Sequence, residues 1–378
     1  MRLEPAVPPE VLAAIRAPFA ALAAQAIDPP VIQPLGLLLD LAGEAMHARL
    51  FVVQGQGGEE ACLRPDFTIP VAREHIAAGA AEGRYVYEGR AFRVSPVGAV
   101  HAEEFLQIGL ESFGDGRIAA ADAEAASLAW RGSVAGGRAD LTLRLGDVGL
   151  YRAFVAALGL AESLTIRLTR AFSRPRAMGA ELERAQALTD QPREGDRIAG
   201  LLADLPQAEA TAVLQDLWAL AGIQPVGGRT AAEIAHRLIE RAEAAKAPRL
   251  TGAEAGLIRR YLEIADSPRP ALDRIADLAR EGGLSLDSAL EAWSQRLLAL
   301  DEAGVPEDRV VLATGFGRAF GYYDGVLFEV RSAALDETSP VAGGGRYDAL
   351  PARLGGGGRP GAVGCMVRPA RAWTGAVA

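Results

Sequence analysis

Residues 104–111 read Glu-Phe-Leu-Gln-Ile-Gly-Leu-Glu, and their alternation sets the class of fold. Apolar side chains occupy every second position, while Gln107, Gly109 and Glu111 stand between them. A period of two is the period of a β-strand, because successive side chains of a strand point to opposite faces. We therefore predict a strand that carries Gln107 and Glu111 on one face. Taken alone, the pattern favours a face open to solvent, and a polar pocket is the alternative.

Short apolar runs of similar length lie on both sides of this strand. The further strand candidates are Phe51–Gln54, Ala61–Arg64, Tyr85–Gly89, Leu141–Gly146 and Val326–Arg331. Helical spacing of apolar residues is found in Pro9–Gln25, Ile69–Gly79 and Ala120–Arg131. Neither a fixed-period repeat nor a regular alternation of strand and helix appears. The sequence therefore predicts an α+β fold, with a mostly antiparallel sheet flanked by helices.

The pattern of apolar residues changes between residues 171 and 304, where strand-like alternation ends and alanine-rich helical spacing begins. Two Thr-x-x-Glu segments in this region, Thr230–Glu233 and Thr251–Glu254, fit the capping box that begins a helix. We predict a helical insertion domain over 171–304, which interrupts a single core formed by residues 1–170 and 305–378.

The composition is that of a globular protein, since 50% of the 378 residues are hydrophobic and 23% are charged. A net charge of −9 and a pI of about 5.2 argue against a surface for duplex nucleic acid. Only one of the 39 basic residues, Lys246, is a lysine. That scarcity excludes a P-loop lysine, and it excludes a lysine nucleophile or Schiff base at any other position.

The cysteines and histidines are too few and too scattered for a metal or disulfide site. Cys62 and Cys365 have no paired spacing, and the 4 histidines include no i,i+4 pair. We therefore expect no metal, no disulfide and no cofactor. The N-terminus lacks a secretory signal, and the longest apolar run, Leu35–Leu39, is far shorter than the ~20 residues of a membrane helix. We expect a soluble cytoplasmic protein without membrane contact.

Four segments combine polar residues with strand-like runs, and a fifth is rich in glycine. They are Arg64–Thr68, Tyr87–Arg93, Phe105–Gly114, Arg318–Tyr323 and Gly344–Asp348. In this order they resemble the core of class II aminoacyl-tRNA synthetases, and within that class histidyl-tRNA synthetase. The first is similar to that family's Arg-Pro-Glu-Gly-Thr segment, the next two to its motif 2, and the last two to its Arg-Gly-Leu-Asp-Tyr-Tyr and Ala-Gly-Gly-Arg-Tyr-Asp elements. The resemblance covers about residues 25–170 and 305–372.

The resemblance implies a pocket for free histidine, whose ammonium, carboxylate and imidazole groups each need a partner. Acceptors for the ammonium would come from three matched positions: Asp66, Thr68 and Gln107. Glu111, together with Tyr322 or Tyr323, would hold the imidazole. Arg318 would face the carboxylate, which suits its planar guanidinium group. The alternative for Arg318 is an arginine in solvent at the end of a strand.

The groups that would bind and activate ATP are mostly missing from the matched positions. After Arg93, where motif 2 continues with a glutamate and further arginines, the chain has Ser95 and Pro96, and Glu103 reverses an expected charge. Motif 3 keeps only its last arginine, and Pro369 would interrupt its helix unless it lies in the first turn. We therefore predict no catalytic residue and no aminoacylation, with Arg93 as a candidate residual anion-binding residue.

We expect no anticodon-binding domain of the kind that follows motif 3 in such synthetases, because the chain ends soon after Arg371. Together with the net charge of −9, this predicts no tRNA binding. A core that keeps a histidine pocket but loses the ATP groups resembles the regulatory subunits of ATP phosphoribosyltransferase. That enzyme catalyses the first step of histidine biosynthesis.

This second resemblance implies a non-catalytic subunit that a short-form catalytic subunit requires for activity and that confers feedback by histidine. It also implies a self-dimer through Val31–Leu41, which resembles motif 1, within a hetero-octamer of four regulatory and four catalytic chains. Two alternatives stay open. One is an active histidine-activating ligase or truncated synthetase-like enzyme with a non-standard acceptor, which the retention of Arg318 favours. The other is an assembly scaffold that binds no ligand.

Overall fold

The structure is a computed structural model that describes most of the chain. The described residues are 3–42, 44–55, 57–58, 60–95, 98, 101–172, 174–186, 205, 207–221, 249–318, 320–356 and 361–375. Compact packing divides the chain into two units: the first is Met1–Gly159, Thr169–Pro175 and Gly256–Ala378, and the second is Leu160–Leu168 and Arg176–Ala255. The helical insertion domain over 171–304 stays a prediction.

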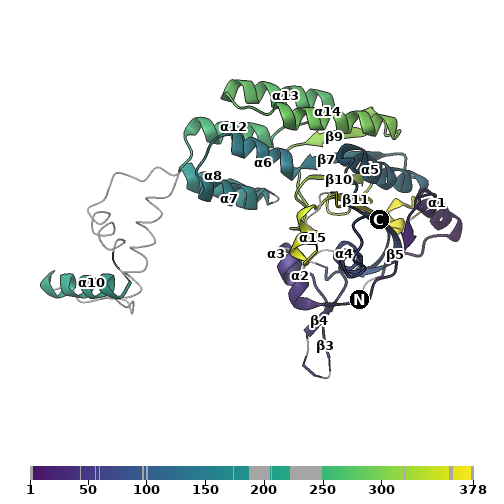
Figure 1. The fold of residues 1–378 in the computed structure, drawn as a ribbon, viewed down its shortest axis with the longest axis horizontal. Coiled ribbons are helices and arrows are strands. Elements are labelled where there is room, and N and C mark those ends of the chain that lie inside the picture. The colour runs from purple at the N-terminus through teal and green to yellow at the C-terminus, as the bar shows by residue number, and fades with distance from the viewer. Residues whose placement is uncertain are drawn as a thin grey trace. The chain divides into compact units, whose positions relative to one another are not determined.

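Nine strands of the described residues form one sheet in the first unit (Figure 1). In their order across the sheet they are β1 (Gln25–Ala26), β5 (Gly83–Phe92), β6 (Glu104–Phe113), β12 (Val363–Val367), β11 (Ala342–Arg346), β10 (Val326–Ser332), β7 (Leu141–Asp147), β9 (Val310–Ala313) and β8 (Ala265–Asp266). The β1–β5 and β7–β9 pairs are parallel. All other pairs in this sheet are antiparallel. The predicted mostly antiparallel sheet is therefore confirmed.

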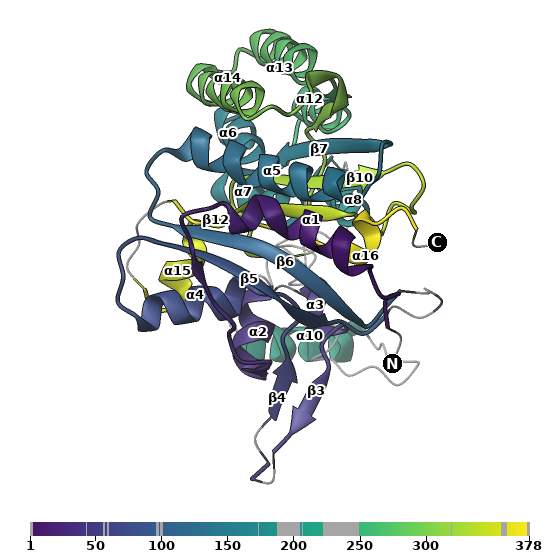
Figure 2. The same ribbon diagram turned by 90° about the vertical axis from the view of Figure 1, so that its right-hand side faces the viewer.

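A smaller sheet of the same unit consists of β2 (Ile32–Pro34), β4 (Glu60–Leu63) and β3 (Val52–Gln54). Strands β3 and β4 extend away from the large sheet in both ribbon views (Figures 1 and 2). Pro34 is the last residue of β2, and α2 (Leu35–Ala42) begins directly after it. This position agrees with the absence of an amide hydrogen in proline, which confines it to the ends and edges of strands.

Helices flank the large sheet, as the sequence predicted. Besides α2, those that lie wholly in the first unit are α1 (Pro9–Ala20), α3 (Glu44–His47), α4 (Thr68–Ala77), α5 (Ile118–Ala135), α6 (Val148–Ala157), α13 (Pro268–Gly282), α14 (Asp287–Glu302), the 3₁₀ helix η1 (Glu307–Arg309), α15 (Ala349–Arg353) and α16 (Pro369–Ala372). Helix α5 packs on β11 and β12, and α1 and α14 pack on α5 (Figure 2). Alanines of α5 are buried and β11 contains three glycines in sequence, so helix and sheet approach closely.

Helices α8 (Pro175–Gln186) and α10 (Gln207–Ala221) lie almost wholly in the second unit, while α7 (Glu162–Ala171) and α12 (Gly252–Leu262) contribute residues to both. None of the helices in the described part of the chain is both long enough and apolar enough to cross a membrane.

The region that the sequence predicted as helical contains one confirmed cap and one unexpected strand. The Thr251–Glu254 capping box forms, because the Glu254 amide donates to Thr251 Oγ1 at 3.2 Å and the Thr251 amide donates to Glu254 Oε2 at 2.7 Å. The Thr230–Glu233 box lies outside the described residues. Strand β8 was not expected, since its two residues pair with β9, and that partner is remote in sequence.

Candidate functional site

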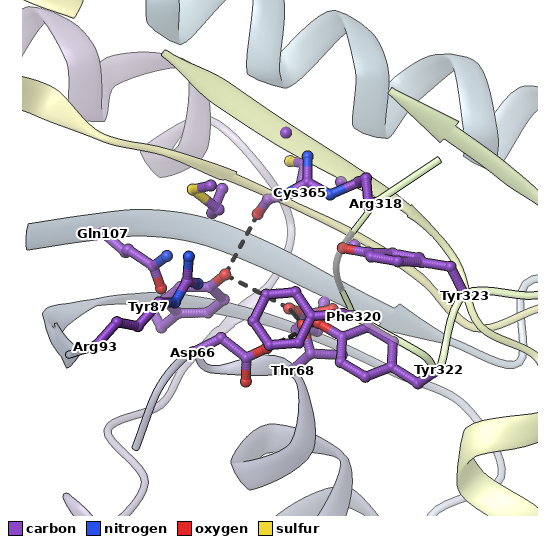
Figure 3. A pocket seen from close by; sticks show the side chains of 15 residues that line it. Asp66, Thr68, Tyr87, Arg93, Gln107, Arg318, Phe320, Tyr322, Tyr323 and Cys365 are labelled. Atoms are coloured by element: carbon purple, nitrogen blue, oxygen red, sulfur yellow. Dashed lines mark hydrogen bonds between the residues drawn. The ribbon is translucent and has the colours of Figure 1, made fainter. Parts of the chain in front are cut away.

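A narrow pocket forms where α4 begins and where β5, β6, β11 and β12 meet the loop between β9 and β10 (Figure 3). It holds about 290 Å³ of empty space, solvent at its mouth included. All eight residues that the sequence predicted for binding line it: Asp66, Thr68, Arg93, Gln107, Glu111, Arg318, Tyr322 and Tyr323. In Figure 3, Arg93 and Gln107 lie at one end of the pocket, and Tyr322 and Tyr323 lie at the other.

The polar face of β6 forms one wall of this pocket. Gln107 and Glu111 are each only 1% exposed, so the reading of this face as open to solvent is wrong. Two glycines make the space. Glu111 is paired with Gly364 of β12, where a Cβ atom would collide with the Glu111 carboxylate. Gly109, between the two polar residues, leaves room for the Tyr87 hydroxyl group.

Three hydroxyl groups donate hydrogen bonds to the Glu111 carboxylate. Thr68 Oγ1 donates to Glu111 Oε1 at 2.9 Å, and the Tyr87 hydroxyl donates to the same oxygen at 3.4 Å. The Tyr347 hydroxyl donates to Glu111 Oε2. Burial raises the pKa of Glu111 to about 8, although these hydrogen bonds act in the opposite direction. Glu111 is therefore a buried, oriented carboxyl group whose pKa lies well above that of a free glutamate.

Asp66 and Tyr322 form a second polar pair on the pocket wall. The Tyr322 hydroxyl donates to Asp66 Oδ2 at 2.8 Å. Burial raises the pKa of Asp66, while the charge of Arg93 and the bond from Tyr322 lower it. The Tyr322 ring packs against Phe320 and Tyr323, with ring centroids 5.2 Å and 4.7 Å apart. Aromatic packing therefore holds the loop between β9 and β10 at the pocket.

Arg318 is buried in the pocket, so the alternative of an arginine in solvent is wrong. Its side chain is 7% exposed, and Nη1 lies 3.3 Å from Glu329 Oε1 and donates to the Phe328 carbonyl at 3.1 Å. Its guanidinium carbon lies 5.7 Å from the centroid of the Tyr323 ring. Gly343 leaves the room that this group needs, because a Cβ atom there would collide with it.

Several buried polar atoms of the pocket side chains have no hydrogen-bond partner among the described residues. They are Asp66 Oδ1, Gln107 Oε1, Gln107 Nε2 and Arg318 Nε. Leaving a buried donor or acceptor unsatisfied costs roughly 1–3 kcal/mol, and such groups are rare in folded proteins. The set contains both acceptors and donors, which indicates a ligand that carries both kinds of group.

Sequence reasoning missed the roles of two tyrosines in this site. Tyr87 and Tyr347 lie in segments that the family resemblance covers, but the sequence assigned neither a contact. Both are buried, and both hydroxyl groups reach Glu111. The sequence held part of the information needed to predict these contacts. A buried tyrosine needs a partner for its hydroxyl group, and Glu111 of β6 is an acceptor.

The positions that match the ATP-binding motifs of the synthetases lie after β5, before β6 and at α16. Glu103 Oε1 accepts from the Ser95 amide at 3.5 Å, and Pro96 lies outside the described residues. Pro369 is the first residue of α16, a position where proline fits a helix, so it does not interrupt that helix. Arg93 Nε donates to the Pro65 carbonyl at 2.8 Å.

Comparison with known proteins identifies relatives along nearly the whole chain. The profile of the family described as histidyl-tRNA synthetase matches residues 11–251 and 229–370. The ATP phosphoribosyltransferase regulatory subunit of Agrobacterium fabrum is 39% identical over 355 residues, which are 92% of each chain. The proteins of the same name from Mesorhizobium japonicum and Brucella anthropi are 36% and 35% identical, over 92% and 91% of each chain.

Solved structures share the fold. An ATP phosphoribosyltransferase regulatory subunit/histidyl-tRNA synthetase from Bacillus halodurans has a TM-score of 0.62 at 20% identity, over 97% of this chain and 78% of that one. A histidine–tRNA ligase subunit from Alicyclobacillus acidocaldarius has a TM-score of 0.57 at 21% identity, over 98% and 97%. These likenesses confirm the predicted synthetase-like core.

Proposed function

We propose that this chain, which belongs to the family of histidyl-tRNA synthetase-like regulatory subunits of ATP phosphoribosyltransferase, uses the pocket described above to sense free histidine. As a member of that family it is a non-catalytic subunit and acts in histidine biosynthesis. The finer proposal is that a short-form catalytic subunit requires it for activity, and that histidine bound in the pocket lowers that activity. We place this complex in the cytoplasm and expect it to bind no tRNA.

The unpaired polar atoms of the pocket carry this proposal, because they match the groups of free histidine. The unpaired oxygens of Asp66 and Gln107 are acceptors for the ammonium group, and Arg318 Nε is a donor for the carboxylate. The imidazole ring then faces Glu111 and Tyr323. Every charged or polar group of the amino acid thus has a partner of opposite character.

The bond strengths are sufficient for sensing at metabolite concentrations. Hydrogen bonds to charged groups contribute roughly 1.5–3 kcal/mol each, and micromolar affinity requires about 8 kcal/mol after ordering costs. Five or six such bonds together reach this affinity after the ordering costs are met. Feedback further requires that histidine favour one state of the complex over another by about 1–3 kcal/mol.

Two measurements on the complex test the proposal. Calorimetry should detect histidine binding to the full chain, and phosphoribosyl transfer by the chain together with its catalytic subunit should fall when histidine is added. Glu111→Gln should keep the activation but need at least about tenfold more histidine for inhibition. The control is Glu74→Gln, at an exposed position of α4, which should behave as wild type. Absence of histidine binding in the wild type would overturn the proposal.

The competing ligase function predicts a different reaction. A histidine-activating enzyme exchanges pyrophosphate with ATP when histidine is present, whatever its final acceptor. We expect no such exchange, in line with the regulatory name that the relatives share. Exchange well above a no-histidine blank would restore the ligase.

We further propose that the chain forms a dimer through Val31–Leu41 within a hetero-octamer of four regulatory and four catalytic chains. Apolar side chains at the smaller sheet support the dimer: Val31 is 40%, Ile32 60% and Val52 53% exposed. Large exposed apolar side chains that gather at one place are typical of protein interfaces.

A further inference from the structure

A second and larger pocket of the first unit is not used by the proposed function. It lies where α4 and β6 end, beside α15, and the two helices are neighbours in the fold (Figure 2). It holds about 910 Å³ of empty space, solvent at its mouth included, and its described lining shares no residue with that of the first pocket. Pockets of roughly 300–1,000 Å³ are the usual size for small organic ligands.

Most of the described residues that line this second pocket are glycine or alanine, so the backbone forms much of its wall. Examples are Ala80 after α4, Gly114 after β6 and Gly356 after α15. The apolar side chains of Ile76 and Phe113 line the same space. A wall of backbone and aromatic ring suits a flat ligand, because a planar group can pack against both over its whole face.

His75 of α4 brings a polar group to this wall. The residue is 6% exposed, its Nδ1 atom lies 3.1 Å from the Tyr85 hydroxyl group, and its ring stacks on that of Phe113 with centroids 4.4 Å apart. Burial lowers the pKa of His75, so the ring is neutral near pH 7. Its other nitrogen, Nε2, has no hydrogen-bond partner among the described residues. A buried ring nitrogen that is held in place without a partner indicates that a ligand supplies one.

The surroundings of the second pocket favour N–H donors over anions. None of the described lining residues carries a permanent charge. Helix α4 ends at Ala77, and the last carbonyl groups of a helix carry partial negative charge. Glu82 lies beside Gly114, where a Cβ atom would collide with the Glu82 Cγ atom. Arg353 of α15 is outside the lining, and its Nη2 donates to the Asp40 carbonyl at 2.8 Å.

We propose that the second pocket binds a flat organic ligand that carries N–H donors and no negative charge, such as an aromatic amine or amidine. Its N–H groups donate to His75 Nε2 and to carbonyl groups at the end of α4, and its ring packs on the side chains of Ile76 and Phe113. The site is separate from the proposed histidine pocket, so either proposal can fail while the other holds.

Titration of the full chain with benzamidine, followed by ligand-observed NMR, tests the chemistry of the site. Benzamidine is a flat ring with N–H donors, and benzoate has the same shape but offers only acceptors and a negative charge. Benzamidine should bind in the millimolar range expected of so small a ligand, and at least about tenfold more tightly than benzoate. Absence of benzamidine binding, or equal binding of benzoate, would overturn the proposal.

Three variants test whether benzamidine binds in the second pocket. Ala80→Leu, at an exposed position of the lining, fills the mouth of the pocket and should abolish binding. Ala77→Leu, at an exposed position of α4 outside the lining, is the matched control and should bind as wild type does. His75→Asn keeps a polar group that can bond to Tyr85 but removes Nε2, so benzamidine should bind at least about fivefold more weakly. Binding that survives Ala80→Leu would place benzamidine elsewhere and overturn the proposal.

Discussion

Glu111 accepts from three hydroxyl groups of the described residues at a position where it is only 1% exposed. Such crowding fixes the orientation of the carboxyl group more strongly than any single bond could, because each donor removes a rotation that the others permit. The lone pairs left over then point in defined directions into the pocket, and a ligand must match them.

Removal of the Tyr347 hydroxyl group tests this orientation. Tyr347→Phe should weaken histidine binding about five- to tenfold, because loss of one hydrogen bond to a buried carboxyl group costs about 1–1.5 kcal/mol. The measurement is calorimetric titration with histidine. Tyr85→Phe is the control, since Tyr85 is buried on the same strand as Tyr87 but bonds to His75. Similar losses in both variants would mean that the hydroxyl groups serve only stability.

Histidine binding should depend on pH through Glu111. Its pKa of about 8 means that the empty pocket holds a proton at pH 7, whereas the imidazole N–H favours the ionised carboxylate. Binding therefore releases a proton, and affinity should rise with pH between 6.5 and 8, by up to about tenfold per unit. Calorimetry at three pH values measures the slope. Glu111→Gln should flatten it, and an equal slope in that variant would assign the proton to another group.

Strands β6, β11 and β12 show how whole elements shape the site. Glycine stands at positions 109, 343 and 364, and at each of them a side chain of another residue occupies the space that a Cβ atom would need. The sheet therefore provides the polar groups, and its glycines leave the space around those groups. The three strands together, and no single residue, set the volume of the pocket.

A single methyl group should close the pocket without disturbing the fold. Gly364→Ala places its Cβ atom against the Glu111 carboxylate, so histidine binding should fall at least about tenfold, while overpacking lowers stability by about 1–3 kcal/mol. Gly256→Ala in α12 meets nothing within 4 Å and serves as the control. Calorimetry and urea unfolding measure the two effects. Unchanged affinity in Gly364→Ala would show that the ligand does not use this wall.

The sequence predicted the strands that form the pocket better than it predicted which of their faces are buried. Alternation around Gln107 and Glu111 gave the strand correctly, but the burial of their face depends on β12 and on the loop that carries Tyr322, both more than 200 residues away. Resemblance to a family supplied the pocket residues that alternation could not. Tyr87 and Tyr347 were missed because a tyrosine in a strand, or directly after one, fits a hydrophobic core equally well. Strand β8 was missed for a similar reason, since only its partner makes it a strand.

At the scale of the whole molecule, the proposed dimer makes one surface distinct from the rest. Ile32 of β2 is 60% exposed and lies beside other exposed apolar side chains. In the proposed assembly this surface is covered by a second copy of the chain.

A charge on this surface should separate the two copies. Ile32→Asp should weaken the dimer at least about tenfold, because the interface would have to bury an unpaired carboxylate. Analytical ultracentrifugation of the free chain measures the change. Val134→Asp, at a 45% exposed position of α5, is the control and should leave the sedimentation coefficient unchanged. A dimer that survives Ile32→Asp would place the interface elsewhere.

Strand β11 limits the size of the ligands that the pocket can bind. Side chains rotate away from an oversized molecule, but a peptide backbone bonded along both edges cannot, and β11 is such a backbone, held between β10 and β12 with glycine at three successive positions. The β11 backbone is therefore a wall of the pocket that does not move to accept a larger ligand. If the pocket binds histidine as proposed, methylated or lengthened analogues of histidine would need their extra room at the end lined by Tyr322 and Tyr323, away from β11.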